Sequence, residues 1–208
     1  MSAQQKTPDG VITAIVGSAG SGKTGWLKQK IAKSPRLLVW DIEGQYTEKT
    51  KAVYTRTALV KAIQEPNARI SYQPKGLNDF DFWAKCAFAF VRLGAELGVM
   101  TDIVAEELAD VTSPAKAPDG WGMLVRRCRK YGGNVYGITQ RPAESDKTLF
   151  GNCMILHVCG LQRANDRKYV ALELDLPVSD VAALSRERLE FIHKDMRSGK
   201  VEKGRLTF

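Results

Sequence analysis

The chain has 208 residues, of which 44% are apolar and 26% charged, and its formal charge at neutral pH is +8. These proportions are ordinary for a globular protein. The most apolar window, 86–100, is interrupted by Arg92 and Glu96 and is too short to cross a bilayer, so no membrane span is predicted. The basic excess favours an acidic polymer, nucleic acid above all, as a partner, although a solvated basic surface explains the charge equally well.

Short apolar runs alternate along the chain with longer helical patterns, which is typical of βαβ units and a parallel sheet. The first strand, 11–16, precedes a glycine-rich turn and a helix that reaches about residue 32. Further strands are predicted at 37–40, 69–72, 103–105, 134–139 and 153–159, and helices at 80–97 and 121–131. The second of these helices ends at a Gly-Gly pair, a suitable C-cap.

The end of the chain has a different pattern. Residues 190–194 and 200–207 flank a turn at Ser198 and Gly199, which predicts a β-hairpin. We therefore expect one α/β domain over 1–208, a P-loop ATPase domain with a mainly parallel central sheet flanked by helices. A polar tail at 1–10 would precede it, and the hairpin at 189–208 would close it.

The cysteines give little sign of a metal site. Cys86, Cys128, Cys153 and Cys159 form no C-x-x-C pair, and the chain has only two histidines, so a structural zinc site is not favoured. Cys86 and Cys153 stand in apolar runs and are expected to be buried thiols. This usage fits a reducing, cytoplasmic compartment.

A phosphate-binding motif follows the first strand. Gly17, Ser18, Ala19, Gly20, Ser21, Gly22, Lys23 and Thr24 match the Walker A pattern G-x-x-x-x-G-K-[ST] in full. The glycines let successive backbone N–H groups face the phosphates, and the start of the next helix adds a favourable field for anions. Lys23 is expected to reach the β- and γ-phosphates, and the hydroxyl of Thr24 is expected to bind Mg²⁺. The predicted cofactors are therefore ATP and Mg²⁺.

Acidic and polar residues stand at the ends of other predicted strands. A P-loop needs a carboxylate near the metal and a group that orients the attacking water. Glu106 and Glu107 follow the strand 103–105, and we assign Glu106 to the metal side and Glu107 to the general base. Asp102 is the alternative metal ligand. The alternative to a catalytic role for Glu106 and Glu107 is that both are solvated carboxylates at the start of a helix.

Two further strand ends carry polar groups. Gln140 follows the strand 134–139 and is a candidate to sense the γ-phosphate or to position water, with a capping role as the alternative. Asp41 and Glu43 follow the second strand on the same predicted edge, where a simple turn explains them equally well.

Together these motifs resemble the FtsK/HerA branch of P-loop motor ATPases. The P-loop identifies only the superfamily. The branch is indicated by three further motifs: D-I-E-G-Q-Y at 41–46, E-E at 106–107, and T-Q-R-P at 139–142, which follows R-R-C-R-K-Y-G at 126–132. The short chain looks most like the genome-packaging ATPases of tailless internal-membrane viruses of the tectivirus type, with double jelly-roll capsids. The similarity runs from about Ile12 to Val170, and Glu106 departs from the more common Asp.

The resemblance implies a RecA-like core that acts as a ring of identical subunits, often a hexamer, and drives double-stranded DNA through the ring. It implies a viral protein in the host cytoplasm or on the virion, with capsid-vertex or viral membrane proteins as further partners. Two rivals stay open, namely a small-molecule P-loop kinase and an assembly protein that uses its nucleotide as a switch. The ATPase rate with and without DNA, together with the oligomeric mass, would separate the three.

Ring motors also need a cation from the neighbouring subunit. Arg126, Arg127 and Arg129 lie on the helix 121–131, and we assign the role to Arg127, with Arg163 as a second candidate. DNA binding or pairing with surface carboxylates is the alternative for each arginine. The C-terminal hairpin carries a strip of basic residues that is one candidate for the lining of the DNA channel: Lys194, Arg197, Lys200, Lys203 and Arg205. The alternative is that these residues form a solvated face.

Overall fold

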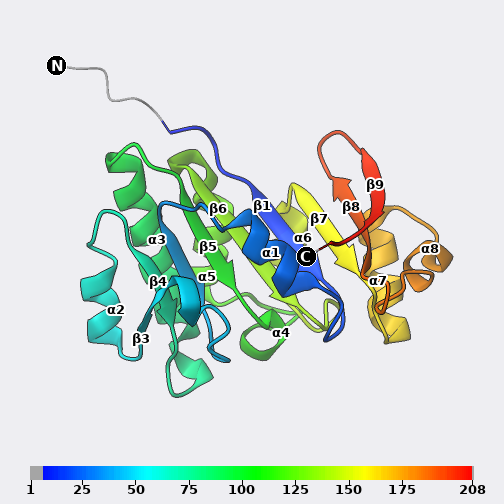
Figure 1. Ribbon diagram of the computed structural model, residues 1–208, viewed down its shortest axis with the longest axis horizontal. Helices are drawn as coiled ribbons and strands as arrows, with labels where there is room; N and C mark the ends of the chain where they lie inside the picture. The colour runs from blue at the N-terminus through cyan, green and yellow to red at the C-terminus, as the bar shows by residue number, and fades with distance from the viewer. Residues whose placement is uncertain (1–6, 208) are drawn as a thin grey trace. The chain divides into compact units, whose positions relative to one another are not determined.

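The computed structural model describes residues 7–207, so most of the predicted tail at 1–10 lies outside the described part (Figure 1). The chain divides into two compact units. The first contains the residues up to Ile12, Lys33–Glu106 and Pro118–Tyr136, and the second contains Thr13–Ala32, Glu107–Ala117 and the residues from Gly137 onward.

The first unit holds four strands in the order β3-β4-β2-β5, and then the start of β6 (Gly133–Thr139). They are β2 (Leu37–Trp40), β3 (Lys51–Val53), β4 (Arg69–Tyr72) and β5 (Thr101–Ala105). Strand β2 pairs in parallel with both β4 and β5, and β3 pairs in parallel with β4. Every residue of β2 and β5 is buried, as expected for parallel strands covered on both faces.

Helices α2 (Arg56–Ala62), α3 (Phe80–Glu96) and α5 (Asp119–Arg127) belong to the same unit, with three short 3₁₀ turns. Helix α3 contacts both α5 and the strands β2 and β5. An aromatic cluster fills this interface: the ring centroid of Phe80 lies 5.2 Å from that of Trp40, 5.5 Å from Trp83 and 5.6 Å from Trp121. Burial of three tryptophans supplies much of the apolar area that holds α3 and α5 to the sheet.

The second unit contains the end of β6 followed by β1 (Ile12–Val16), β7 (Ile155–Cys159), β8 (Glu190–Asp195) and β9 (Val201–Arg205), in that order. Strands β1 and β7 are parallel, whereas β7–β8 and β8–β9 are antiparallel. Its helices are α1 (Lys23–Lys30), α4 (Leu108–Val111), α6 (Lys147–Asn152), α7 (Ala164–Leu174) and α8 (Val178–Ala182). The hairpin of β8 and β9 is drawn in orange and red in Figure 1.

These elements confirm the predicted α/β fold with a mainly parallel sheet and a C-terminal β-hairpin. The strands β2 and β4 begin and end where the sequence predicted. Strand β5 begins earlier, at Thr101, because the backbone of Asp102 pairs with β2; the Asp102 carboxylate accepts hydrogen bonds from Ser34 and Asn134. The pattern did not indicate β3, α2, α7 or α8, which are short or weakly amphipathic. In the part of the chain that the structure describes, no helix is long and apolar enough to cross a bilayer.

Candidate nucleotide site

The glycine-rich motif forms a loop between β1 and α1, as its residue types predict. Val16 ends the strand and Lys23 begins the helix. Gly20 and Gly22 have φ angles of 71° and 94°, in the left-handed region that side chains disfavour. A Cβ atom on Gly17 would lie 2.5 Å from Ser21 Oγ and 2.8 Å from the Cβ of Cys159, so this position has no room for a side chain. The loop therefore needs glycine for both its turn and its packing.

The ends of β6 and β7 hold the start of the loop. The Gly17 N–H donates to the Thr139 carbonyl over 3.3 Å, and the Ser18 N–H donates to the Gly160 carbonyl over 2.9 Å. The hydroxyl of Ser18 accepts a 2.9 Å hydrogen bond from the Gln162 N–H. These contacts position the loop at the carboxyl ends of the strands, where α/β sheets bind their ligands.

The side chain of Lys23 folds back into the loop. Lys23 is 6% exposed, and its Nζ donates to the Ser18 carbonyl over 3.0 Å. A cavity of about 300 Å³ opens beside it, lined by Gly20, Ser21, Gly22, Lys23, Thr24, Gly25 and Leu189. An ammonium group and a curled run of backbone N–H groups are the components that bind a polyphosphate.

Glu107 and Gln140 meet in the second unit. Nε2 of Gln140 donates to Oε1 of Glu107 over 2.6 Å, and both side chains are partly exposed. Glu107 caps α4 with φ 48° and ψ 55°, a left-handed conformation that is unfavourable for a residue with a side chain. Gln140 directly follows Thr139, whose carbonyl accepts from Gly17. The predicted base and the predicted water-positioning amide thus form one pair, close in the chain to the residue that holds the P-loop.

Glu106 has a separate environment in the first unit. It is 9% exposed, and Oε1 accepts a hydrogen bond from the phenol of Tyr46. Burial and the nearby carboxylate of Glu106 raise the pKa of Tyr46 far above its usual range, so the phenol remains a donor. The sequence reasoning noted Tyr46 only as part of D-I-E-G-Q-Y and missed this contact, which needs the tertiary structure.

Asp41 and Asp102, considered from sequence as acidic groups of the site, have structural partners. Asp41 accepts hydrogen bonds from the N–H groups of Gln45 and Tyr46 and from the hydroxyl of Ser71, so it organises the turn after β2. Glu43 is exposed on that turn. Asp102 is the second residue of β5, at the end of the strand opposite Glu106, and burial raises its pKa. The alternative reading of Asp102 as a metal ligand is therefore not supported.

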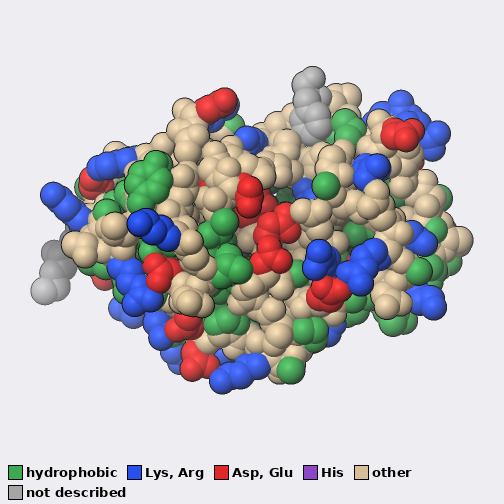
Figure 2. Space-filling model, turned by 90° about the horizontal axis from the view of Figure 1, so that it is seen from below, with side chains coloured by type: hydrophobic (Ala, Val, Ile, Leu, Met, Phe, Trp, Pro, Cys, Tyr) green, Lys and Arg blue, Asp and Glu red, His purple; other side chains and the backbone are tan. Residues whose placement is uncertain are grey.

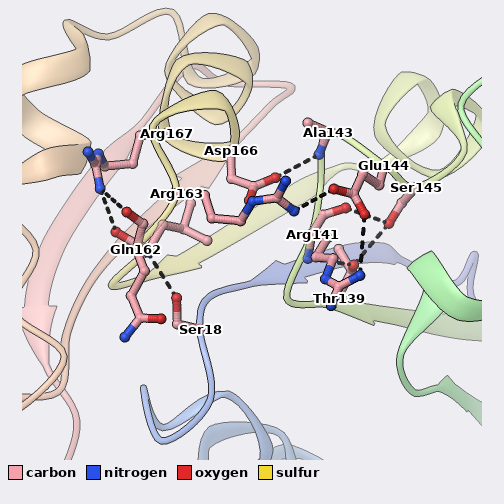
Figure 3. A network of polar contacts seen from close by, with 11 residues as sticks. Ser18, Thr139, Arg141, Ala143, Glu144, Ser145, Gln162, Arg163, Asp166 and Arg167 are labelled. Carbon is pink, nitrogen blue, oxygen red and sulfur yellow. Dashed lines mark hydrogen bonds and ion pairs between the residues drawn. The ribbon is translucent and has the colours of Figure 1, made fainter.

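A network of arginines and carboxylates lies beside the P-loop in the second unit (Figure 3). Arg163 forms an ion pair with Glu144 and approaches Asp166 Oδ2 to 3.9 Å, while Arg141 lies 3.5 Å from the other carboxylate oxygen of Glu144. Asp166 also accepts from the Ala143 N–H over 3.2 Å. Arg163, the second candidate for a trans-acting cation, thus has carboxylate partners within its own chain.

Arg127 is exposed at the end of α5, and no ion pair involves it among the described residues. Several of the Lys and Arg side chains visible in Figure 2 have an Asp or Glu side chain next to them. The basic residues of the hairpin all have acceptors. Lys194 donates a hydrogen bond to the Leu174 carbonyl. The remaining basic residues form the ion pairs Arg197–Asp195, Lys200–Glu202, Lys203–Asp180 and Arg205–Glu190. The solvated-face alternative for this strip is therefore favoured.

The chain's two histidines gather behind the P-loop helix. The ring of Trp26 on α1 stacks on His157 with centroids 4.0 Å apart and planes 10° apart. Nδ1 of His157 lies 3.4 Å from Nδ1 of His193 on β8, and Nε2 lies 3.6 Å from Sγ of Cys159. Burial, together with the neighbouring His193 and Lys30, lowers the pKa of His157 to about 3. The four cysteines are all buried, as expected for Cys86 and Cys153.

Thr24 offers one hydroxyl oxygen at the cavity, the kind of protein ligand that Mg²⁺ would use together with a bound nucleotide. Within residues 7–207, no group of three or more His, Cys, Asp or Glu side chains could hold a metal ion. Mg²⁺ usually keeps several waters and binds one or two protein oxygens together with substrate phosphates. A hydroxyl at Thr24, on the lining of the cavity, is such an oxygen.

Comparisons with known proteins agree with this architecture. No family model matches the chain. Protein P9 of Pseudoalteromonas phage PM2 is 31% identical over 201 residues, which cover 93% of this chain and 89% of that protein. The genome packaging NTPase B204 of Sulfolobus turreted icosahedral virus 2, solved with AMPPCP, has a TM-score of 0.79 at 13% identity and covers 96% of this chain and 98% of its own.

Two other solved structures show how far the likeness extends. The DNA-packaging ATPase B204 of Sulfolobus turreted icosahedral virus has a TM-score of 0.75 at 15% identity, over 97% of this chain and all of its own. The N-terminal domain of zonular occludens toxin from Neisseria meningitidis has a TM-score of 0.54 at 15% identity, over 96% of this chain and 95% of its own. These findings confirm the likeness to viral genome-packaging ATPases that the motifs indicated, and at this identity the structural similarity concerns the fold.

Proposed function

The chain belongs to the family of protein P9 of Pseudoalteromonas phage PM2. From this premise we propose that the protein is an ATP-driven motor that packages a double-stranded DNA genome. One observation carries the proposal: a complete P-loop, held by the ends of β6 and β7, lies on the fold of the DNA-packaging ATPase B204. The basic balance of the chain suits a partner bound through its phosphate backbone without sequence readout.

In this mechanism the loop residues 17–24 bind the phosphates of ATP. Lys23 leaves the Ser18 carbonyl and pairs with the β- and γ-phosphates, because a phosphate oxygen is the stronger acceptor for an ammonium group. Thr24 and Glu106 are the proposed ligands of Mg²⁺, which would neutralise charge on the phosphates when bound. The phenol of Tyr46 holds one oxygen of Glu106 and so restricts how that carboxylate turns.

Glu107 is the proposed general base. Gln140 holds one of its carboxylate oxygens and leaves the other to accept a proton from water. The same amide can turn to the γ-phosphate or the attacking water, so the pair links the state of the nucleotide to the orientation of the base. The left-handed backbone of Glu107 supports this role, because strained residues of this kind concentrate at functional sites.

The motor works as a ring of identical subunits, for which a hexamer is the first expectation, and Arg127 of one subunit stabilises the phosphoryl group transferred in the next. Arg127 is exposed, and unlike Arg163 it is not engaged in an ion pair with Glu144, which supports this choice. A protein with this role would work in the host cytoplasm or on the virion, with capsid-vertex or viral membrane proteins as further partners.

The test is the ATPase rate of the purified protein with and without linear double-stranded DNA, measured beside its oligomeric mass. We expect a multimer whose turnover rises with DNA and loses that stimulation steeply as salt is added, because phosphate contacts release counterions. Lys23→Ala is the control and should remove all hydrolysis. A monomer that DNA does not stimulate would favour the kinase, and slow hydrolysis coupled to release of a protein would favour the assembly switch.

A further inference from the structure

The cavity beside the P-loop has one wall that does not belong to the P-loop. Six of its lining residues are consecutive, from Gly20 to Gly25, and the seventh is Leu189, which directly precedes β8. Phosphates need N–H groups, cations and a metal, and none of these is supplied by a branched aliphatic side chain. A leucine on this wall suits the flat, weakly polar face of an aromatic ring.

The backbone of Leu189 adopts a conformation that leucine disfavours. Its φ angle is 53°, in the left-handed region where glycine and asparagine are the usual residues. Hydrogen bonds fix it from both sides: its N–H donates to the Arg186 carbonyl over 3.1 Å, and its carbonyl accepts from the Leu206 N–H over 3.0 Å. The fold thus holds an aliphatic side chain where turn formation alone would favour a small or polar one.

The turn 184–189 and the P-loop share an anchor. Gly160 accepts the Ser18 N–H, and a Cβ atom on Gly160 would lie 3.0 Å from both the Leu184 carbonyl oxygen and the Arg186 nitrogen. The turn therefore packs directly on the residue that positions the loop. The turn also lines a second cavity of about 300 Å³, together with the segment after β7; its lining is Gly160, Leu161, Gln162, Leu184, Ser185, Arg186 and Glu187.

The helix after the P-loop is also tied to this region. Nε2 of Gln29 on α1 donates to the Thr207 carbonyl over 3.0 Å, and Thr207 follows the Leu206 that bonds to Leu189. Gly25 at the start of α1 has no side chain to fill the space between the helix and Leu189. The cavity therefore lies between the start of α1 and Leu189.

We propose that the turn 184–189 binds the nucleoside of the nucleotide and that Leu189 packs against the face of its base. The inference rests on the proposed nucleotide-binding function of the P-loop and adds to it the element that holds the base. Because the contact is with the ring face, it does not by itself distinguish the hydrogen-bonding edge of adenine from that of guanine.

The test compares two probes, ATP and inorganic tripolyphosphate, by calorimetric titration in the presence of Mg²⁺. Leu189→Ala should weaken ATP binding about tenfold, the loss expected for one apolar contact with a base, and should leave tripolyphosphate binding within about twofold. The matched control is Leu172→Ala, because Leu172 is 81% exposed on α7 in the same unit. It should change neither affinity.

A further variant separates the apolar contact from the strained backbone. Leu189→Asn fits the left-handed conformation but lacks the aliphatic surface, so it should keep the stability of the protein and weaken ATP as the alanine variant does. Unchanged ATP affinity in both variants, or equal losses for ATP and tripolyphosphate, would overturn the role of Leu189. Failure of the unaltered protein to bind either probe would instead overturn the nucleotide site as a whole.

Discussion

Acidification should destabilise this protein through His157. The side chain is 0% exposed, and its pKa is lowered to about 3 by burial and by the neighbouring His193 and Lys30. The unfolded chain, with an ordinary histidine pKa near 6.5, therefore takes up the proton first as the pH falls. Stability should be fully present above about pH 6.5 and should decrease through the window from 6.5 down to about 3. At pH 4.5 the loss from this one group is about 3 kcal/mol.

The assay is urea unfolding at pH 7.5 and pH 4.5 without nucleotide, monitored by circular dichroism. His157→Phe keeps an aromatic ring over Trp26 and removes the titration. Its difference in unfolding free energy between the two pH values should therefore be smaller by about 3 kcal/mol. Asp102 titrates in both proteins and cancels in this comparison, whereas His193 contacts His157 and its change is part of the measured difference. Equal losses in the two proteins would refute the reasoning, and His157→Gln serves if the phenylalanine variant does not fold.

Three further predictions concern the proposed motor. The Glu107→Gln variant should bind ATP but hydrolyse it at least about a hundredfold more slowly, because an amide cannot accept a proton from water. If Glu106→Gln is instead the variant that binds tightly and turns over slowly, Glu106 is the general base and Glu107 the metal-side residue. Arg127→Ala subunits and Glu107→Gln subunits should each be nearly inactive alone. Mixed rings should regain some turnover, because an intact Glu107 can then meet an intact Arg127 from its neighbour. If rings shown to be mixed stay inactive, a trans-acting Arg127 is excluded. Because Lys200 and Lys203 already pair with carboxylates, their replacement by alanine should change DNA affinity by less than about twofold in a salt-matched binding assay, and a larger loss would return the hairpin to the DNA surface.

The phosphate loop could be located from sequence because its chemistry is local. Each residue from Gly17 to Thr24 contributes through its own backbone or side chain, and the spacing of the motif alone places Lys23 and Thr24 at a helix start. The buried strands β2 and β5 were equally accessible, since parallel strands covered on both faces are continuous apolar runs. Strand β3 has only three residues, of which one is exposed and one is buried, so its sequence shows no apolar run that would predict a strand.

The partners of the other site residues depended on the tertiary structure. The sequence indicated that Glu106, Glu107 and Gln140 stand at strand ends, but which of them meet is decided by the order of strands in the sheet and by the turn of the chain at Glu107. The same holds for Tyr46, which reaches Glu106 from a turn 60 positions away in the chain.

Leu189 shows the limit most clearly. Its sequence context is an ordinary charged turn before a hairpin, and nothing in its neighbours' residue types indicates the P-loop. Only the pairing of β7 with β8 and the close approach of the turn to Gly160 bring it to the wall of the phosphate cavity. The sequence determined the P-loop, because this motif is a contiguous stretch of backbone. The tertiary structure decided what surrounds the loop, because those contacts join residues that are far apart in the chain.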